Sequence, residues 1–367
     1  MGKPLALLDR ENHCRCAGPG MVKDVRNMSG HVKSRKNPFL VVLLVVLIGL
    51  LAFVVAAGIY IIKLSLTLQQ QPDYADGAHE EAEDDVTGLV PIGEKDAEEL
   101  TGEADPIKED KDTVDVLLLG VDSRSNNFSG RSDVMLLIRV NTRTGSIKMV
   151  SFMRDLLVNV PGHGKNRINT AYMYGGPELA LQVVNETFGL RVENYMLFNF
   201  YGTTSIIEMM GGVTIDIESN EIDTTNQIID ELNFIFKSDS PRLKKAVPQR
   251  LDGVQATAYM RNRKSGTDSA RTNRQRTVLM ALLRSLGGME LSRLPGLIDK
   301  GSNYLRTNIP IVDLPGYATM LMGLSDTQVG QMVVPDPFKN VNYDGMAVVV
   351  MEDPEAEISE LHAFLLN

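Results

Sequence analysis

Two carboxylates lie beside neighbouring apolar runs, in a pattern that could hold a divalent cation. Asp122 follows the run 114–121 in Gly-Val-Asp-Ser-Arg, and Asp133 precedes the run 134–140 in Arg-Ser-Asp. If the runs are adjacent strands, the two acids leave neighbouring strand ends. Oxygen ligation by few carboxylates suits Mg²⁺, with Mn²⁺ as a substitute, because Mg²⁺ keeps waters and recruits substrate phosphate oxygens. The alternative is that Asp122 only caps a turn, and on that motif alone capping is favoured.

Basic residues follow in the next two motifs. Arg154 ends a third apolar run in Ser-Phe-Met-Arg-Asp, and Lys165 and Arg167 lie in Lys-Asn-Arg-Ile-Asn-Thr-Ala-Tyr. Gly175-Gly176 then opens a predicted helix, whose first amides could favour an anion. A simple loop is the alternative interpretation of the glycine pair.

A cluster of arginines with few acids gives the strongest signal. Residues 261–276 contain five arginines and one lysine, and Asp268 is the only acid among them. Guanidinium groups bind phosphate through paired hydrogen bonds and keep their charge at working pH. Arg271 and Gln275 are four residues apart and share a helix face, while Arg261 and Arg263 end the preceding segment. We expect the cluster to bind an external anion; a solvated basic face is the alternative.

Several function classes lack the residues they need. Beyond residue 113 the only histidines are His163 and His362, so a Ser-His-Asp hydrolase lacks a convincing base. No nucleic-acid partner is expected, because residues 113–367 carry a net charge of only −3 and no aromatic residue interrupts the arginine cluster. The side chains left to carry out chemistry are acids, arginines and amides.

Short apolar runs alternate with helical patterns and predict the elements that position these groups. Runs of four to eight apolar residues suggest buried strands, and spacings of three and four suggest helices. The predicted strands are 114–121, 134–140, 147–152, 195–200, 213–217 and 345–351, and the predicted helices are 176–188, 203–210, 253–263 and 269–286. Their interleaving predicts a three-layer α/β/α sandwich around a central mixed sheet.

The rest of the chain predicts a membrane anchor. Residues 39–62 form an apolar stretch of 24 without a charge, long enough for a transmembrane helix. Residues 1–38 hold eight Lys/Arg against three acids, which predicts a cytoplasmic N-terminus. Residues 63–112 are acidic and should form a flexible linker to an extracellular domain at 113–367. Cys14 and Cys16 fall in the tail, so no disulfide is expected in that domain.

In series, these motifs resemble the LytR-CpsA-Psr family of bacterial cell-wall ligases. The likeness runs through Gly-Val-Asp-Ser-Arg, Arg-Ser-Asp, Ser-Phe-Met-Arg-Asp and Lys-Asn-Arg-Ile-Asn-Thr-Ala-Tyr to Asp-Ser-Ala-Arg-Thr-Asn-Arg-Gln. Met153 departs from the proline that many members have before Arg-Asp. The resemblance implies a Mg²⁺-dependent phosphotransferase that moves a glycopolymer, such as teichoic acid or capsule, from a polyprenyl-pyrophosphate carrier to peptidoglycan through a phosphodiester.

The resemblance also assigns roles to residues. Asp122 and Asp133 match the acids associated with the metal. The pyrophosphate would be bound by Arg154, Lys165, Arg167, Arg261, Arg263, Arg271 and Gln275. The residues expected to be catalytic are Asp122, Asp133, Arg154 and Arg271. A membrane lipid carrier is the implied partner. Hydrolysis of the same pyrophosphate, or a non-catalytic module that binds or regulates envelope components, are the other readings. The motifs predict neither the polymer nor the oligomeric state.

Overall fold

The computed structural model describes residues 53, 55–70, 84–102, 104–107, 111–121, 128–262, 268–287, 292, 294–314, 316 and 329–367. The chain divides into two compact units, 1–55 and 56–367, and the predicted α/β domain belongs to the second. Within the described residues, no helix combines the length and apolarity needed to cross a bilayer. Most of the predicted span 39–62 lies outside them.

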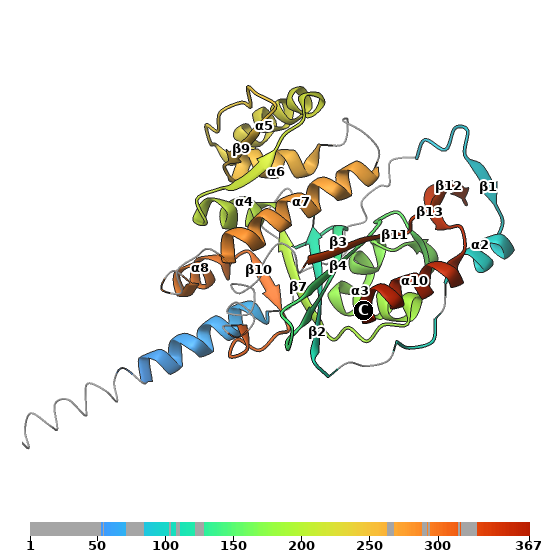
Figure 1. Ribbon diagram of the computed structural model, residues 1–367, viewed down its shortest axis with the longest axis horizontal. Helices are drawn as coiled ribbons and strands as arrows, with labels where there is room; N and C mark the ends of the chain where they lie inside the picture. Colours follow the sequence, from blue (N-terminus) through green and yellow to red (C-terminus); the bar gives the residue numbers. More distant parts are fainter. Residues whose placement is uncertain are drawn as a thin grey trace, which may run out of the picture. The chain divides into compact units, whose positions relative to one another are not determined.

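A six-stranded mixed sheet forms the centre of the domain (Figure 1). Its order is β10-β7-β2-β3-β4-β11, with parallel pairs β7–β2 and β4–β11 and antiparallel pairs elsewhere. The strands are β2 (Thr113–Val121), β3 (Ser132–Asn141), β4 (Ile147–Phe152), β7 (Asn194–Asn199), β10 (Leu305–Thr307) and β11 (Val329–Val334). The predicted α/β class and central mixed sheet are confirmed.

Alternation along the strands gives the sheet two apolar faces, because successive side chains point to opposite sides. On β3, Met135 and Leu137 join the cluster that contains α3 (Thr170–Phe188) and α10 (Pro354–Leu366). Val134 and Leu136 join a second cluster, to which α7 (Asp268–Gly287) contributes Met280. Helices therefore pack on both faces.

A separate apolar cluster holds the segment between β7 and α7. It is built from a helix trio and a two-stranded antiparallel sheet, which Figure 1 shows grouped together. The elements are α4 (Phe200–Met209), β8 (Val213–Asp216), η1 (Ser219–Glu221), α5 (Ile222–Phe236), β9 (Pro248–Leu251) and α6 (Gly253–Arg261); α8 (Leu294–Gly301) follows α7. The strand predicted at 213–217 therefore exists, but it pairs with β9 and not with the central sheet.

The N-terminal segment of the domain differs from the predicted linker. β1 (Val90–Ile92) pairs in parallel with β12 (Phe338–Tyr343), which pairs with β13 (Met346–Met351) in a three-stranded sheet. α2 (Glu94–Leu100) follows, and its Ala97 is fully buried. Acidic composition suggested a solvated tether, but Ile92, Ala97 and Leu100 of this segment join an apolar cluster with β12 and β13.

The predicted helix at 176–188 is preceded in the structure by a short helical segment that was not predicted. α3 begins at Thr170, directly after the hairpin of β5 (Leu157–Val160) and β6 (Gly164–Arg167). Gly175 and Gly176 leave helical geometry, and Gly176 has a φ of 68°, which favours glycine. The glycine pair thus separates two helical segments, and the second segment, which runs from Pro177 to Phe188, follows the pair as predicted.

One buried carboxyl should make the stability of the domain depend on pH. Glu357, in the first turn of α10, accepts a hydrogen bond from the Asp336 amide at 2.6 Å. Burial raises the pKa of Glu357 to about 7. Because this pKa lies above the ordinary value, the stability is fully present at acid pH and is lost as pH rises through about 7.

We predict that Glu357→Gln flattens this dependence. Between pH 5 and pH 8 the free energy of unfolding of the wild type should fall by up to about 3 kcal/mol relative to the variant. Urea denaturation at several pH values measures the difference. Parallel curves for the two proteins would contradict the assignment.

Candidate functional site

Five strand ends meet at one end of the central sheet and gather the candidate residues. Register pairs Val121 at the end of β2 with Ser132 at the start of β3 and with Asn199 at the end of β7. Phe152 at the end of β4 pairs with Val334 at the end of β11. Residues at these strand ends therefore lie together, and Asp133, the second residue of β3, is one of them. Asp122 follows β2 but lies outside the described residues.

A β-bulge turns Asp133 toward this end. Gly120 pairs with Val134 and Val121 with Ser132, so Asp133 is the extra residue of β3. A Cβ on Gly120 would come within 2.8 Å of the Val134 Cβ, so only glycine allows this close approach. Bulges of this kind re-aim side chains next to functional sites.

The turn after β4 contains Arg154 and makes backbone hydrogen bonds with neighbouring segments. The Met153 amide donates to Val334 O at 2.8 Å and the Leu156 amide to Met153 O at 3.0 Å. The carbonyls of the turn accept from the residue before α3 and from β13, at 3.2 Å for Asn169 N to Arg154 O and 2.9 Å for Val349 N to Asp155 O. The Arg154 backbone is thereby fixed.

Arg154 and Asp133 form the ion pair at the centre of the site. Arg154 Nη1 donates to Asp133 Oδ1 at 2.9 Å, and the Asp133 side chain is only 8% exposed. On its other side, Arg154 Nε lies 3.2 Å from Asp155 Oδ2, whose second oxygen lies 3.6 Å from Arg167 Nε. A charged group held in this way can meet an anion without first reorganising.

Lys165 and Arg167 contact acids of the N-terminal segment. Lys165 Nζ donates to Glu94 Oε1 at 2.6 Å, and this hydrogen bond is the main cause that lowers the pKa of Glu94. Arg167 Nη2 pairs with Asp84 and donates to Ala347 O at 3.1 Å. The structure therefore gives both residues protein partners, and their contact with a pyrophosphate stays a prediction.

The arginine cluster divides into residues with different surroundings. Arg261 Nη1 lies 3.8 Å from Glu231 Oε1, and Gln275 is 7% exposed on α7. Arg271 lies in the first turns of α7. Its side chain and the whole of Arg263 are outside the described residues.

One arginine of the cluster has an internal partner that the sequence concealed. Arg274 Nε donates to Glu221 Oε1 at 2.7 Å, and the two side chains are 5% and 7% exposed. Arg274 Nη1 also donates to Asn262 O at 2.8 Å. The partner comes from 53 residues earlier in the chain, so counting local acids overestimated the unpaired charge of the cluster.

Sequence reasoning missed further polar groups near this end of the sheet. Ser132 Oγ and Asn169 Oδ1 are buried and have no hydrogen-bond partner within the described part of the chain. Arg306, on β10, lies 4.9 Å above the Phe128 ring, and burial lowers its pKa. Asn169 was visible inside a quoted motif, but nothing in the sequence marked Arg306.

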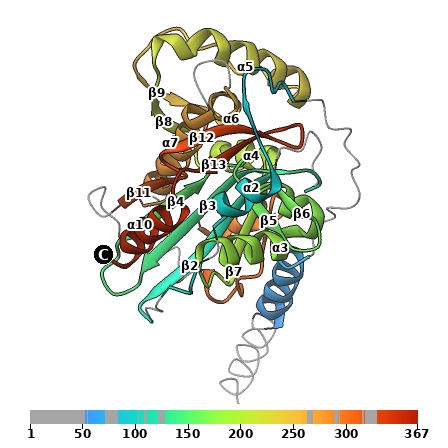
Figure 2. The same ribbon diagram turned by 90° about the vertical axis from the view of Figure 1, so that its right-hand side faces the viewer.

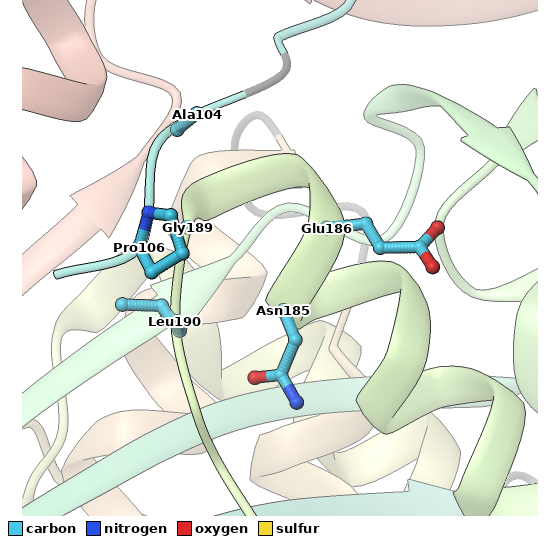
Figure 3. Close-up of a pocket in the computed structure, with 6 residues that line it drawn as sticks. All are labelled: Ala104, Pro106, Asn185, Glu186, Gly189 and Leu190. Atoms are coloured by element: carbon cyan, nitrogen blue, oxygen red, sulfur yellow. The ribbon is translucent and has the colours of Figure 1, made fainter.

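A surface pocket lies elsewhere and lacks cationic groups. Figure 3 shows its lining residues, Ala104, Pro106, Asn185, Glu186, Gly189 and Leu190. They come from the N-terminal segment and the C-terminal end of α3. The candidate site is at the opposite end of this helix, where Asn169 contacts Arg154. With Glu186 as the only charged residue, this pocket does not suit an anionic ligand.

Comparison with known proteins decides the family. The LytR_cpsA_psr family model matches residues 81–362. The chain belongs to this family. The match begins before β1, in agreement with an N-terminal segment that is part of the domain.

Curated relatives in this family carry transferase and regulatory names. The chain is 32% identical to the polyisoprenyl-teichoic acid–peptidoglycan teichoic acid transferase TagU of Oceanobacillus iheyensis, over 60% of this chain and 67% of the relative. It is 29% identical to TagT of Bacillus subtilis, over 60% and 68%. The regulatory protein MsrR of Staphylococcus aureus is 28% identical, over 67% and 72%.

Solved structures of the family share the fold. A structure of TagT bound to LIIa-WTA has a TM-score of 0.56 and 27% identity, covering 72% of this chain and 94% of that one. TagT with bound octaprenyl pyrophosphate lipid has a TM-score of 0.52 and 26% identity, covering 72% and 95%. The family that the motifs suggested is therefore confirmed.

The buried Arg274–Glu221 pair makes a prediction about stability. Glu221→Gln should lower the free energy of unfolding by about 3–5 kcal/mol, because it leaves a buried guanidinium without its counter-charge. Asp230→Asn is the matched control, since Asp230 and Arg242 form an exposed pair, and it should cost less than about 1 kcal/mol. Similar losses in urea denaturation of the two variants would contradict the structural role of Arg274.

Proposed function

We propose that the protein is a phosphotransferase that moves a glycopolymer from a polyprenyl-pyrophosphate carrier to peptidoglycan. The observation that carries this proposal is the Arg154–Asp133 ion pair, fixed at the sheet end where five strand termini meet. Family membership and the transferase names of relatives support the same reaction. Octaprenyl pyrophosphate bound to TagT supports the class of donor.

The reaction needs placement and charge neutralisation more than covalent chemistry. An acceptor hydroxyl attacks the phosphorus attached to the sugar, the bond from that phosphorus to the carrier phosphate breaks, and polyprenyl phosphate leaves with the bond's electron pair. Arg154 would bind non-bridging oxygens and neutralise charge as it develops. Asp122, outside the described residues, is our candidate for accepting the hydroxyl proton, and Arg261, Arg263 and Arg271 for further contacts with the pyrophosphate.

A divalent cation fits the oxygen donors at this end of the sheet. Asp133 supplies a carboxylate, and the neighbouring Ser132 Oγ is a buried oxygen with no hydrogen-bond partner among the described residues. Oxygen donors in small number suit Mg²⁺, or Mn²⁺ as a substitute. We propose that Asp133 and Asp122 hold the ion, which would polarise the phosphate oxygens when bound.

A membrane location suits a donor on a lipid carrier. We propose that residues 39–62 span the membrane, with residues 1–38 in the cytoplasm and the α/β domain outside the cell. The tether between them would then be shorter than 63–112, because residues 84–107 contribute β1, α2 and the buried Ile107 to the domain.

The site makes a direct prediction about activity. Asp133→Ala and Arg154→Lys should each lower transfer by about 10²-fold or more, because the first removes a preorganised carboxylate and the second replaces the planar guanidinium fork with a single ammonium. The assay is transfer from a polyprenyl-pyrophosphate-linked saccharide to peptidoglycan oligomers by the full chain in detergent. Arg242→Ala, at an exposed residue, is the control and should transfer normally.

Two results would count against this assignment. Transfer at the wild-type rate by a folded Asp133→Ala variant would remove Asp133 from the site. Release of saccharide phosphate without any joined product would favour a pyrophosphate hydrolase. Circular dichroism and thermal unfolding establish that each variant is folded before its rate is compared.

A further inference from the structure

A chain of alternating charges leads from the N-terminal segment of the domain to the proposed active site. In order it joins the side chains of Asp84, Arg167, Asp155, Arg154 and Asp133. The spacing is 3.6 Å from Arg167 Nε to Asp155 Oδ1, 3.2 Å from Asp155 Oδ2 to Arg154 Nε, and 2.9 Å from Arg154 Nη1 to Asp133 Oδ1. Each arginine lies between two acids.

Partial burial strengthens these contacts. The side chains of Asp133 and Arg167 are each 8% exposed, and Arg154 and Asp155 are 22% and 21% exposed. Ion pairs shielded from water are screened little by salt, and loss of one partner leaves a charge that cannot be solvated well. The contact of Asp155 with Arg154 Nε is an ion pair without hydrogen-bond geometry, so removal of Asp155 would disturb Arg154 through the loss of its charge.

The guanidinium of Arg167 makes several contacts within the protein. Its Nε and Nη2 donate to Ala347 O at 3.2 and 3.1 Å, and Nη2 also pairs with Asp84. Asp84 accepts in addition from the Ala347 amide at 3.1 Å, so the acid holds Arg167 and β13 together. Binding a pyrophosphate would require Arg167 to abandon several protein contacts.

We infer that Asp155 and Arg167 are positioning residues: Arg167, held by Asp84, orients Asp155, and Asp155 orients Arg154 toward the donor pyrophosphate. The role of Arg154 in that statement rests on the proposed function. The orientation itself rests on the ion-pair chain and on the four backbone hydrogen bonds of the turn after β4. Arg167 thereby affects catalysis without touching the substrate.

The first test separates positioning from direct binding. Asp155→Asn in the full chain should lower kcat for transfer by about 10–100-fold while the Kd for octaprenyl pyrophosphate, measured by calorimetry, changes less than about 3-fold. Asp155→Glu, which keeps the charge, should restore part of the rate. Asp112→Asn is the matched control, because Asp112 and Arg143 form an exposed ion pair.

A double-mutant cycle tests whether Arg167 acts through Asp155. Arg167→Gln should lower kcat in the wild-type background but cause little further loss in Asp155→Asn, since residues of one network are not additive. A further loss of 10-fold or more in the double variant, or a 10-fold weaker donor Kd in Arg167→Gln alone, would overturn the inference. If either variant fails to fold, Asp84→Asn, at the more exposed end of the chain, replaces it.

A readout without turnover keeps the inference separate from the proposed function. Asp155→Asn should raise the reactivity of Arg154 toward phenylglyoxal several-fold, as mapped by peptide mass spectrometry, because Arg154 loses a carboxylate partner. This result would stand even if the wild type transferred nothing, which would refute the proposed function alone. Unchanged Arg154 reactivity in a folded Asp155→Asn variant would refute the positioning role.

Discussion

The site depends on one constraint: a cation and an anion must be held together, largely out of water, at the place where strands β2, β3, β4, β7 and β11 end or begin. Arg154 and Asp133 meet there at 2.9 Å. Three features bring these two side chains together. They are the β-bulge at Asp133, the close approach of strands at Gly120 and the hydrogen-bonded turn after β4. Figure 2 shows β3 and β4 side by side, between α3 on one side and α7 on the other.

Local pattern was sufficient to predict the central strands. β2, β3, β4 and β7 are apolar runs bounded by Gly, Asn or charged residues, and their predicted limits agree with the structure to within two residues. The N-terminal segment was missed, because β1 has three residues and is formed by pairing with β12, almost 250 residues later. Non-local pairing of so short a strand leaves little periodicity to detect.

The sequence predicted which residue types form the site better than it predicted how they contact one another. Asp133 and Arg154 meet because the motifs follow adjacent strands, a relation that sequence order already suggests. Partners of the other arginines could not be inferred, since Glu221 reaches Arg274 and Asp84 reaches Arg167 only through the fold. Charge counting within the window 261–276 therefore overestimated the unpaired charge of the cluster, because Arg274 is paired with Glu221.

The measurement that tests the central claim most directly is the composition of the joined product. The wild-type protein would be given Mg²⁺, a polyprenyl-pyrophosphate-linked saccharide and peptidoglycan oligomers, and the products followed by mass spectrometry. Phosphoryl transfer predicts a peptidoglycan adduct that carries the saccharide and one phosphate, with polyprenyl phosphate released. An adduct without phosphorus would mean glycosyl transfer with pyrophosphate leaving, and it would contradict the account.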